Sequence, residues 1–214
     1  MEQLAKKTGK TYEMDMCSGP LFPKIVAFAV PLILSGILQL LFNAADIIVV
    51  GHFAGRESLA AVGSTTALIN LMINIFIGLS VGVNVIVARY YGAKREKDVQ
   101  DTIHTAMALS IVSGLFLIIV GQLLSRPMLE LMGTPDDVID KSTIYMRIIF
   151  IGMPANMIYN FGSAILRAVG DTKRPLYFLT AAGVINVVLN LFFVIMFQMD
   201  VAGVALATAI SQAI

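Results

Sequence analysis

One acidic residue, Asp46, lies inside a long apolar stretch of the sequence and is the side chain best placed to do chemistry. Of the 14 acidic residues, it alone falls well within such a stretch, at residues 25–51. A carboxylate inside a membrane span is costly and by default marks a functional site. Ser35, Gln39 and Asn43 precede it at helical spacing, so the four side chains share one face. We expect that face to meet other helices or water.

Amide and hydroxyl groups are expected at a similar depth on two other helices. Asn186 and Asn190 are four residues apart in a later apolar stretch, and Thr208 lies in the last one. At about 1.5 Å of rise per residue, Asp46, Asn190 and Thr208 lie roughly 9, 15 and 12 Å from the outer ends of their helices. Such an oxygen-rich site suits a hard cation, and we expect Asp46 to bind Na⁺. A buried carboxylate could instead take up a proton.

Other polar side chains extend this pattern. Gln39 and Asn43 lie on the Asp46 face, and Asn156 and Asn160 are four residues apart in another stretch. We expect all four to line a polar cavity. The structural alternative is that such side chains only join transmembrane helices, at about 0.6 kcal/mol per hydrogen bond.

Two prolines and a pair of glycines also carry expectations about helix shape. Pro31 and Pro154 each remove a backbone hydrogen bond and permit a bend. Pro31 lies about four turns before Asp46, so its bend either responds to the charge of Asp46 or is a static kink. Gly78 and Gly82 have the spacing that permits close helix packing.

The elements that must position these residues are transmembrane helices. The chain is 57% hydrophobic and 14% charged, with a mean hydropathy of +0.83, whereas soluble domains carry about 25% charged residues. A span takes about 20 apolar residues. Five complete runs fit, at residues 25–51, 59–88, 102–124, 143–166 and 175–198, and a sixth starts near Val201 and is cut short at Ile214. We predict an all-α integral membrane protein with a tail over residues 1–20 and a six-helix bundle over residues 21–214.

The positive charges predict the orientation of this bundle, because Lys and Arg gather in cytoplasmic loops. Of the 15 Lys and Arg residues, all but four lie in the N-terminal tail and the even-numbered loops. The four on the other side are Arg56, Arg126, Lys141 and Arg147. We therefore expect a multi-pass protein of the cell inner (plasma) membrane, surrounded by lipid, with a cytoplasmic N-terminus.

Several function classes are disfavoured. The sequence has no nucleophile–base pair, no metal-ligand cluster and no Gly-rich phosphate loop, so we expect neither an enzyme nor a cofactor beyond a coupling ion. His52 and His104 lie near membrane ends, and the lone Cys17 has no disulfide partner. With a net charge of +1, we expect no nucleic-acid partner. Energy for any transport must then come from an ion gradient.

Three stretches together resemble one transporter family. They are ADIIVVG at 45–51, preceded by PLILS at 31–35; ARYYGA at 88–93; and ILRAVGDTKRPLY at 165–177. In this order and spacing the sequence resembles the multidrug and toxic compound extrusion (MATE) family, in particular its prokaryotic DinF-like and multidrug branch. The resemblance extends from about Leu21 to the last residue.

The resemblance implies two six-helix lobes related by a pseudo-twofold axis, of which this chain is the N-terminal lobe and a second six-helix lobe its partner. It implies that Asp46, Asn186, Asn190 and Thr208 form the cation-binding and coupling site, and that Tyr145 lines the same cavity. The family has an acidic residue where this chain has Asn190. Asp46 would therefore carry the charge change alone.

The function expected is secondary antiport, in which a small amphipathic or cationic drug leaves in exchange for Na⁺ or H⁺. One alternative is a flippase for lipid-linked precursors from the same superfamily, which would favour a cationic cavity. Another is a noncatalytic membrane scaffold or an inactive half-transporter. An Asp46→Asn variant separates this last alternative from antiport, since unchanged cation-dependent efflux would favour the scaffold.

Overall fold

The computed structural model describes residues 19–214, and nearly all of these residues are helical, as predicted. The predictions that concern Cys17 and the basic residues before position 19 lie outside the described residues. The elements are α1 (Leu21–Val49), the π-helical turn η1 (Val50–Ala54), α2 (Gly55–Gly92), α3 (Glu96–Leu131), α4 (Asp136–Ile151), α5 (Met153–Ala168), α6 (Lys173–Leu191), the π-helical turn η2 (Phe192–Met196) and α7 (Asp200–Ala213).

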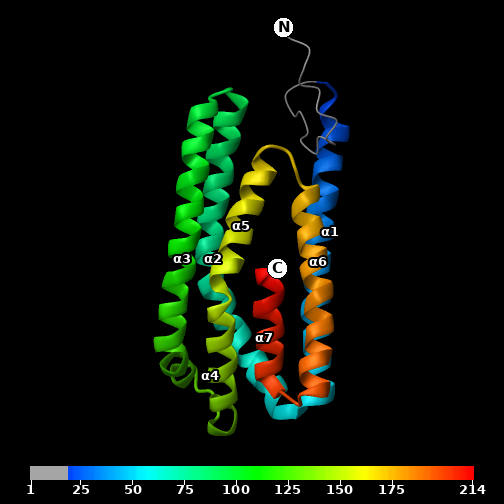
Figure 1. Cartoon of the computed structure of the whole chain (residues 1–214), viewed down its shortest axis with the longest axis vertical. Coiled ribbons are helices and arrows are strands. Elements are labelled where there is room, and N and C mark those ends of the chain that lie inside the picture. The colour runs from blue at the N-terminus through cyan, green and yellow to red at the C-terminus, as the bar shows by residue number, and fades with distance from the viewer. Residues whose placement is uncertain (1–18) are drawn as a thin grey trace.

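The helices run up and down along one long axis and fall into two groups (Figure 1). In one group α1 lies against α6, and in the other α2, α3, α4 and α5 pack on one another. The last helix, α7, packs against both α4 and α6 and so joins the two groups. The turns between α1 and α2, α3 and α4, and α6 and α7 all lie at one end, as the predicted alternation of loops requires.

The first two predicted spans form one continuous helical path of 72 residues, Leu21–Gly92. A straight helix of that length would extend about 108 Å, far beyond a hydrocarbon core of about 30 Å. The path instead reverses at η1, where Gly55 has a φ of 84°, and α2 runs back as part of the second group, beside α3 (Figure 1). The polar linker predicted at residues 51–58 is therefore helical. A π turn and a glycine suffice to reverse the chain.

The fourth predicted span is not one straight helix. It is divided at Gly152 into α4 and α5, which differ in direction by 49°. Pro154 occupies the first turn of α5, where its missing amide hydrogen is not needed. The helical region is also longer than the predicted residues 143–166, because α4 begins at Asp136 directly after Pro135. By length and composition, the described residues contain three helices that could cross a membrane, or four if this bent pair is one span.

The turns at the helix ends are fixed by particular residues. Gly133 and Gly170, with φ values of 71° and 87°, follow α3 and α5 in the left-handed conformation that glycine favours. The fully buried carboxylate of Asp171 accepts hydrogen bonds from the backbone amides of Lys173 and Arg174, both at 3.1 Å, at the start of α6. These bonds satisfy amides that have no partner inside the helix.

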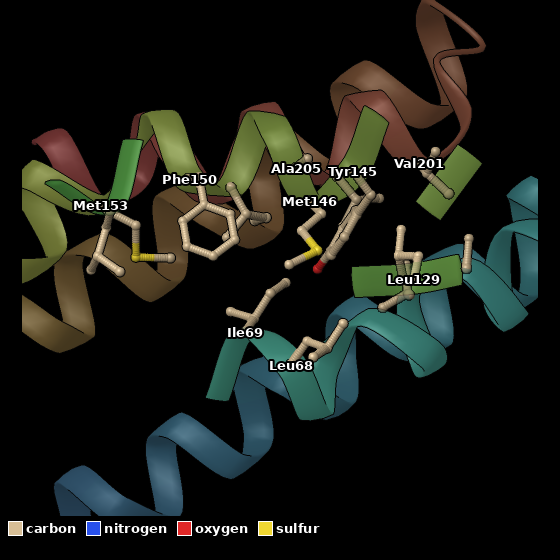
Figure 2. Close-up of a cluster of buried hydrophobic side chains, with 14 of the residues drawn as sticks. Leu68, Ile69, Leu129, Tyr145, Met146, Phe150, Met153, Val201 and Ala205 are labelled. Atoms are coloured by element: carbon tan, nitrogen blue, oxygen red, sulfur yellow. The ribbon is translucent and has the colours of Figure 1, made fainter. Parts of the chain in front are cut away.

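An apolar cluster joins the second group to α7 (Figure 2). Leu68 and Ile69 from α2 meet Met146 and Phe150 from α4, and Ala205 from α7 lies on the far side of α4. These helices therefore form one packed body. By contrast, α1 buries only Pro31 and Val49 among its 29 residues. Its large apolar side chains are mostly exposed, which suits a helix that faces lipid.

Close helix packing occurs at glycines other than the predicted pair. A Cβ atom added to Gly78 or Gly82 would meet no atom within 4 Å, so the predicted close contact there is wrong for the described chain. A Cβ atom on Gly114 or Gly121 of α3 would overlap Pro154 or Phe150 respectively. These two contacts lie on either side of Gly152, so α3 holds the α4–α5 bend in place.

Candidate cation site

The pairing of α1 with α6 brings Asp46 into contact with Asn190. The Asn190 side-chain amide donates a hydrogen bond to the Asp46 carboxylate, across 144 positions of sequence. Asp46 is half-buried, and Asn190 is 1% exposed. Both lie near the turns at the lower end of Figure 1, since Asp46 comes one turn before η1 and Asn190 two residues before η2.

A chain of hydrogen bonds continues from this contact to α7. The same Asn190 amide donates to the side-chain oxygen of Asn186 at 3.1 Å. The Asn186 amide in turn donates to the Thr208 hydroxyl at 3.1 Å, and that hydroxyl donates to the backbone oxygen of Val204 at 3.0 Å. The four residues predicted as the coupling site are thus contiguous. Thr208 was expected at the level of Asn190. It instead contacts Asn186, which lies one helical turn from Asn190.

Two acceptor groups in this chain of bonds remain without full partners. The side-chain oxygen of Asn190 is buried and accepts no hydrogen bond, because the amide nitrogen of the same side chain faces both Asp46 and Asn186. Among residues 19–214, no Lys, Arg or His lies within 4.0 Å of the Asp46 carboxylate. Leaving a buried acceptor unsatisfied costs about 1–3 kcal/mol. The site therefore has a carboxylate and an amide oxygen available to a cation or a proton.

The donor set is one of oxygens, which fits Na⁺ or H⁺ better than a transition metal. No group of three or more His, Cys, Asp or Glu side chains is close enough to hold a metal ion in the part of the chain that the structure describes. A bound Na⁺ would be held by the Asp46 carboxylate, which faces the Asn190 nitrogen in the described chain. Whether these residues act as the coupling site stays a prediction.

Tyr145 does not face open space in the described chain. It is 8% exposed and belongs to the apolar cluster, near Met146 and Leu129 in Figure 2. Its predicted role in lining the cavity stays a prediction.

The other predicted cavity residues fall into two pairs. Gln39 and Asn43 are exposed on α1. Asn156 and Asn160 are half-buried on α5, and the Asn160 amide donates to the Asn156 backbone oxygen at 2.9 Å and to its side-chain oxygen at 2.8 Å. Their hydrogen bonds are therefore partly satisfied within α5, and their role in lining a cavity stays a prediction.

Pro31 is buried within α1, which continues through it as a single helix. The hydroxyl group of Ser35 donates to the backbone oxygen of Pro31 at 2.8 Å. A bend that responds to the charge of Asp46 stays a prediction.

Sequence reasoning missed an ion-pair cluster at the same end of the molecule. Lys141 of α4 lies 2.9 Å from the Glu57 carboxylate and 3.5 Å from that of Asp200. It links the first turns of α2 and α7, and the hydrogen bond that Lys141 donates to the Glu57 carboxylate raises the pKa of Lys141. The three residues belong to segments that are far apart in sequence, so no local pattern could have paired them.

Comparisons with known proteins agree on one family. The family model described as MatE matches residues 31–192. The probable multidrug resistance protein YoeA of Bacillus subtilis is 35% identical over 188 residues, which is 86% of this chain and 41% of that protein. The probable multidrug resistance protein YpnP of the same species is 31% identical over 200 residues, which is 94% of this chain and 45% of that protein.

A solved structure of MATE in the bent conformation superposes with a TM-score of 0.84 at 28% identity, covering 91% of this chain and 43% of that one. The described helices therefore have the arrangement of one lobe of such a transporter. The chain spans less than half the length of each of these relatives.

Proposed function

The chain belongs to the MATE family of multi-pass membrane transporters, and on this premise we propose that it is the N-terminal lobe of a secondary antiporter that exports drugs or organic cations. In this proposal Na⁺ or H⁺ enters as the drug leaves. A second six-helix lobe completes the cavity. The protein lies in the inner (plasma) membrane with its N-terminus in the cytoplasm, because Lys and Arg gather on that side.

The observation that carries the proposal is the uncompensated charge at Asp46. A carboxylate in an apolar bundle is normally paired, and the described residues offer it one amide donor and no base. The buried oxygen of Asn190 next to it accepts no hydrogen bond. A cation or proton at Asp46 would neutralise the charge.

Neutralisation at Asp46 would favour one of the two states of the transporter. The Asp46–Asn190 contact joins α1 to α6, and the Asn186–Thr208 contact joins α6 to α7. Neutralising the carboxylate weakens the first contact, because a hydrogen bond to a charged acceptor is stronger than one to a neutral acceptor, and loss of the cation restores it. One charge that moves through 100 mV supplies about 2.3 kcal/mol, before any concentration gradient is added.

The test is efflux of a fluorescent cationic dye from vesicles that contain the whole transporter. An inward Na⁺ gradient and an inward pH gradient are imposed separately, and the one that drives efflux identifies the ion. Asp46→Asn should abolish the dependence on that gradient. Asp137→Asn serves as a control, because that acid is exposed at the outer end. Gradient-driven efflux that persists in Asp46→Asn would favour a scaffold or a different coupling site.

The flippase alternative predicts a different response. A carrier of lipid-linked precursors would gain from a cationic cavity, whereas the site described has a carboxylate without a base. If vesicles containing the transporter move a lipid pyrophosphate but no dye, the antiport proposal is replaced by that alternative.

A further inference from the structure

The contact between α1 and α6 depends on a glycine that faces an aromatic ring. A Cβ atom added to Gly183 of α6 would overlap three atoms of the Phe42 ring of α1. Gly183 is buried, and Phe42 is half-buried. The ring therefore rests on the α6 backbone, and the two helices approach as closely as glycine permits. Axial distances between packed helices of 8–10 Å are set by the side chains at the contact.

This contact lies next to the candidate cation site on both helices. Phe42 precedes Asp46 by four residues, so the two share a face of α1. Gly183 precedes Asn186 by three residues and Asn190 by seven, so these three share a face of α6. The distance between the helix axes at Phe42 and Gly183 therefore sets how closely Asp46 approaches Asn190.

Few other contacts hold α1 in place. It buries only Pro31 and Val49, and its main helical partner is α6. The candidate site, in contrast, requires the Asp46 carboxylate to remain within hydrogen-bond reach of a 1% exposed amide. A binding constellation tolerates displacements of about 0.5 Å. A methyl group between α1 and α6 would exceed that tolerance.

We propose that Gly183 is a positioning residue for the coupling cation, which seats Phe42 against α6 and thereby holds Asp46 against Asn190. This inference rests on the proposed antiport function. It assigns to the glycine an effect on the affinity for the cation, and it leaves the drug site, wherever it lies in the cavity, unaffected. A glycine that only supported folding would lower the amount of intact protein, and so the maximal efflux rate, without raising the half-saturating concentration of the cation.

The test compares Gly183→Ala with the size-compensating double variant Phe42→Leu/Gly183→Ala. Vesicles containing the whole transporter are loaded with ethidium, and efflux is measured against the concentration of the driving cation and, separately, of the dye. Gly183→Ala should raise the half-saturating cation concentration at least tenfold and leave that of ethidium within twofold. The double variant should return the cation value to within threefold of the wild type. Gly82→Ala, where a Cβ atom meets nothing within 4 Å, should match the wild type.

Two results would overturn the inference. One is a Gly183→Ala protein with wild-type cation dependence. The other is an equal loss in both parameters that Phe42→Leu does not reverse. If Gly183→Ala does not fold, Phe42→Ala replaces it, since it removes the ring without crowding and should also weaken cation dependence. Asp46→Asn is assayed in parallel. Loss of coupling in Asp46→Asn with normal coupling in Gly183→Ala rejects only the role of the glycine, whereas coupling retained in Asp46→Asn rejects the proposed function itself.

Discussion

Replacing Asn190 by Asp should add a second cation to the transport cycle. The substitution keeps the shape of the side chain but replaces the amide that donates to Asp46 by a second carboxylate. Two unit charges about 4 Å apart repel by about 4 kcal/mol at an effective dielectric constant of 20. That repulsion corresponds to roughly a thousandfold in the binding constant of a neutralising cation. The doubly charged pair should therefore bind two cations in the state in which the wild type binds one.

The assay measures the number of charges exchanged per dye molecule. Vesicles containing the whole transporter are held at a series of membrane potentials, and net efflux of a singly charged cationic dye is recorded at each. If one cation enters per dye in the wild type, the exchange moves no net charge; if two enter in Asn190→Asp, one net charge moves inward, so the driving force supplied by 100 mV should rise from about zero to about 2.3 kcal/mol. The steepness of efflux against cation concentration should rise with it.

A matched control distinguishes an effect of placing a carboxylate next to Asp46 from the effect of adding any carboxylate to the bundle. Asn160→Asp also adds a carboxylate inside the bundle, but Asn160 bonds to Asn156 and not to Asp46. It should leave the stoichiometry unchanged. If Asn190→Asp shows the wild-type stoichiometry and wild-type cation dependence, the Asp46–Asn190 contact is not the coupling site and the reasoning fails.

Three other outcomes are expected. Thr208→Val should lower the free energy of unfolding by about 1–2 kcal/mol, because the Asn186 amide that donates to this hydroxyl group loses its acceptor. Thr208→Ser should retain wild-type thermal stability. A Val variant as stable as the Ser variant would contradict the contact. Gly121→Ala should lower the free energy of unfolding by about 1–3 kcal/mol, because the added methyl group overpacks against Phe150. Gly78→Ala is the control and should leave the melting temperature unchanged or slightly higher; equal melting temperatures for the two variants would contradict the contact. The pKa of Lys141 is raised by the hydrogen bond that it donates to Glu57. The stabilisation from this pair is therefore complete below the unfolded-state pKa of lysine near 10.4 and declines as pH rises through the raised folded value. The melting temperatures of wild type and Lys141→Gln should converge at the alkaline end, and a constant difference across pH would count against the pair.

The helix break and the glycine contacts show where sequence patterns were incomplete. Pro154 predicted a bend in the fourth span, and the break at Gly152 lies two residues before it. The spacing of Gly78 and Gly82 predicted close packing, yet both face open space, while Gly183 carries a close contact. Spacing identifies a small-residue face on one helix but contains no information on which helix covers it.

Some properties follow from the sequence alone. The apolar runs determine that the chain is helical and membrane-embedded, since no other solvent could accommodate that surface. The distribution of Lys and Arg predicts its orientation, and Asp46 stands out because it alone is an acid deep in a span. Each of these properties depends on composition within one segment. For that reason each can be read without knowing which segments pack together.

The identity of each partner was decided only by the tertiary structure. Asp46 meets Asn190 across 144 positions because α1 packs on α6, and Asn186 meets Thr208 because α7 joins α6 to α4. The Asn190 oxygen is left free because its amide is used twice. These contacts depend on the distance and rotation between helices. Packing at positions such as Gly183 and Phe42 sets that distance and rotation, and the sequence of one segment does not encode them.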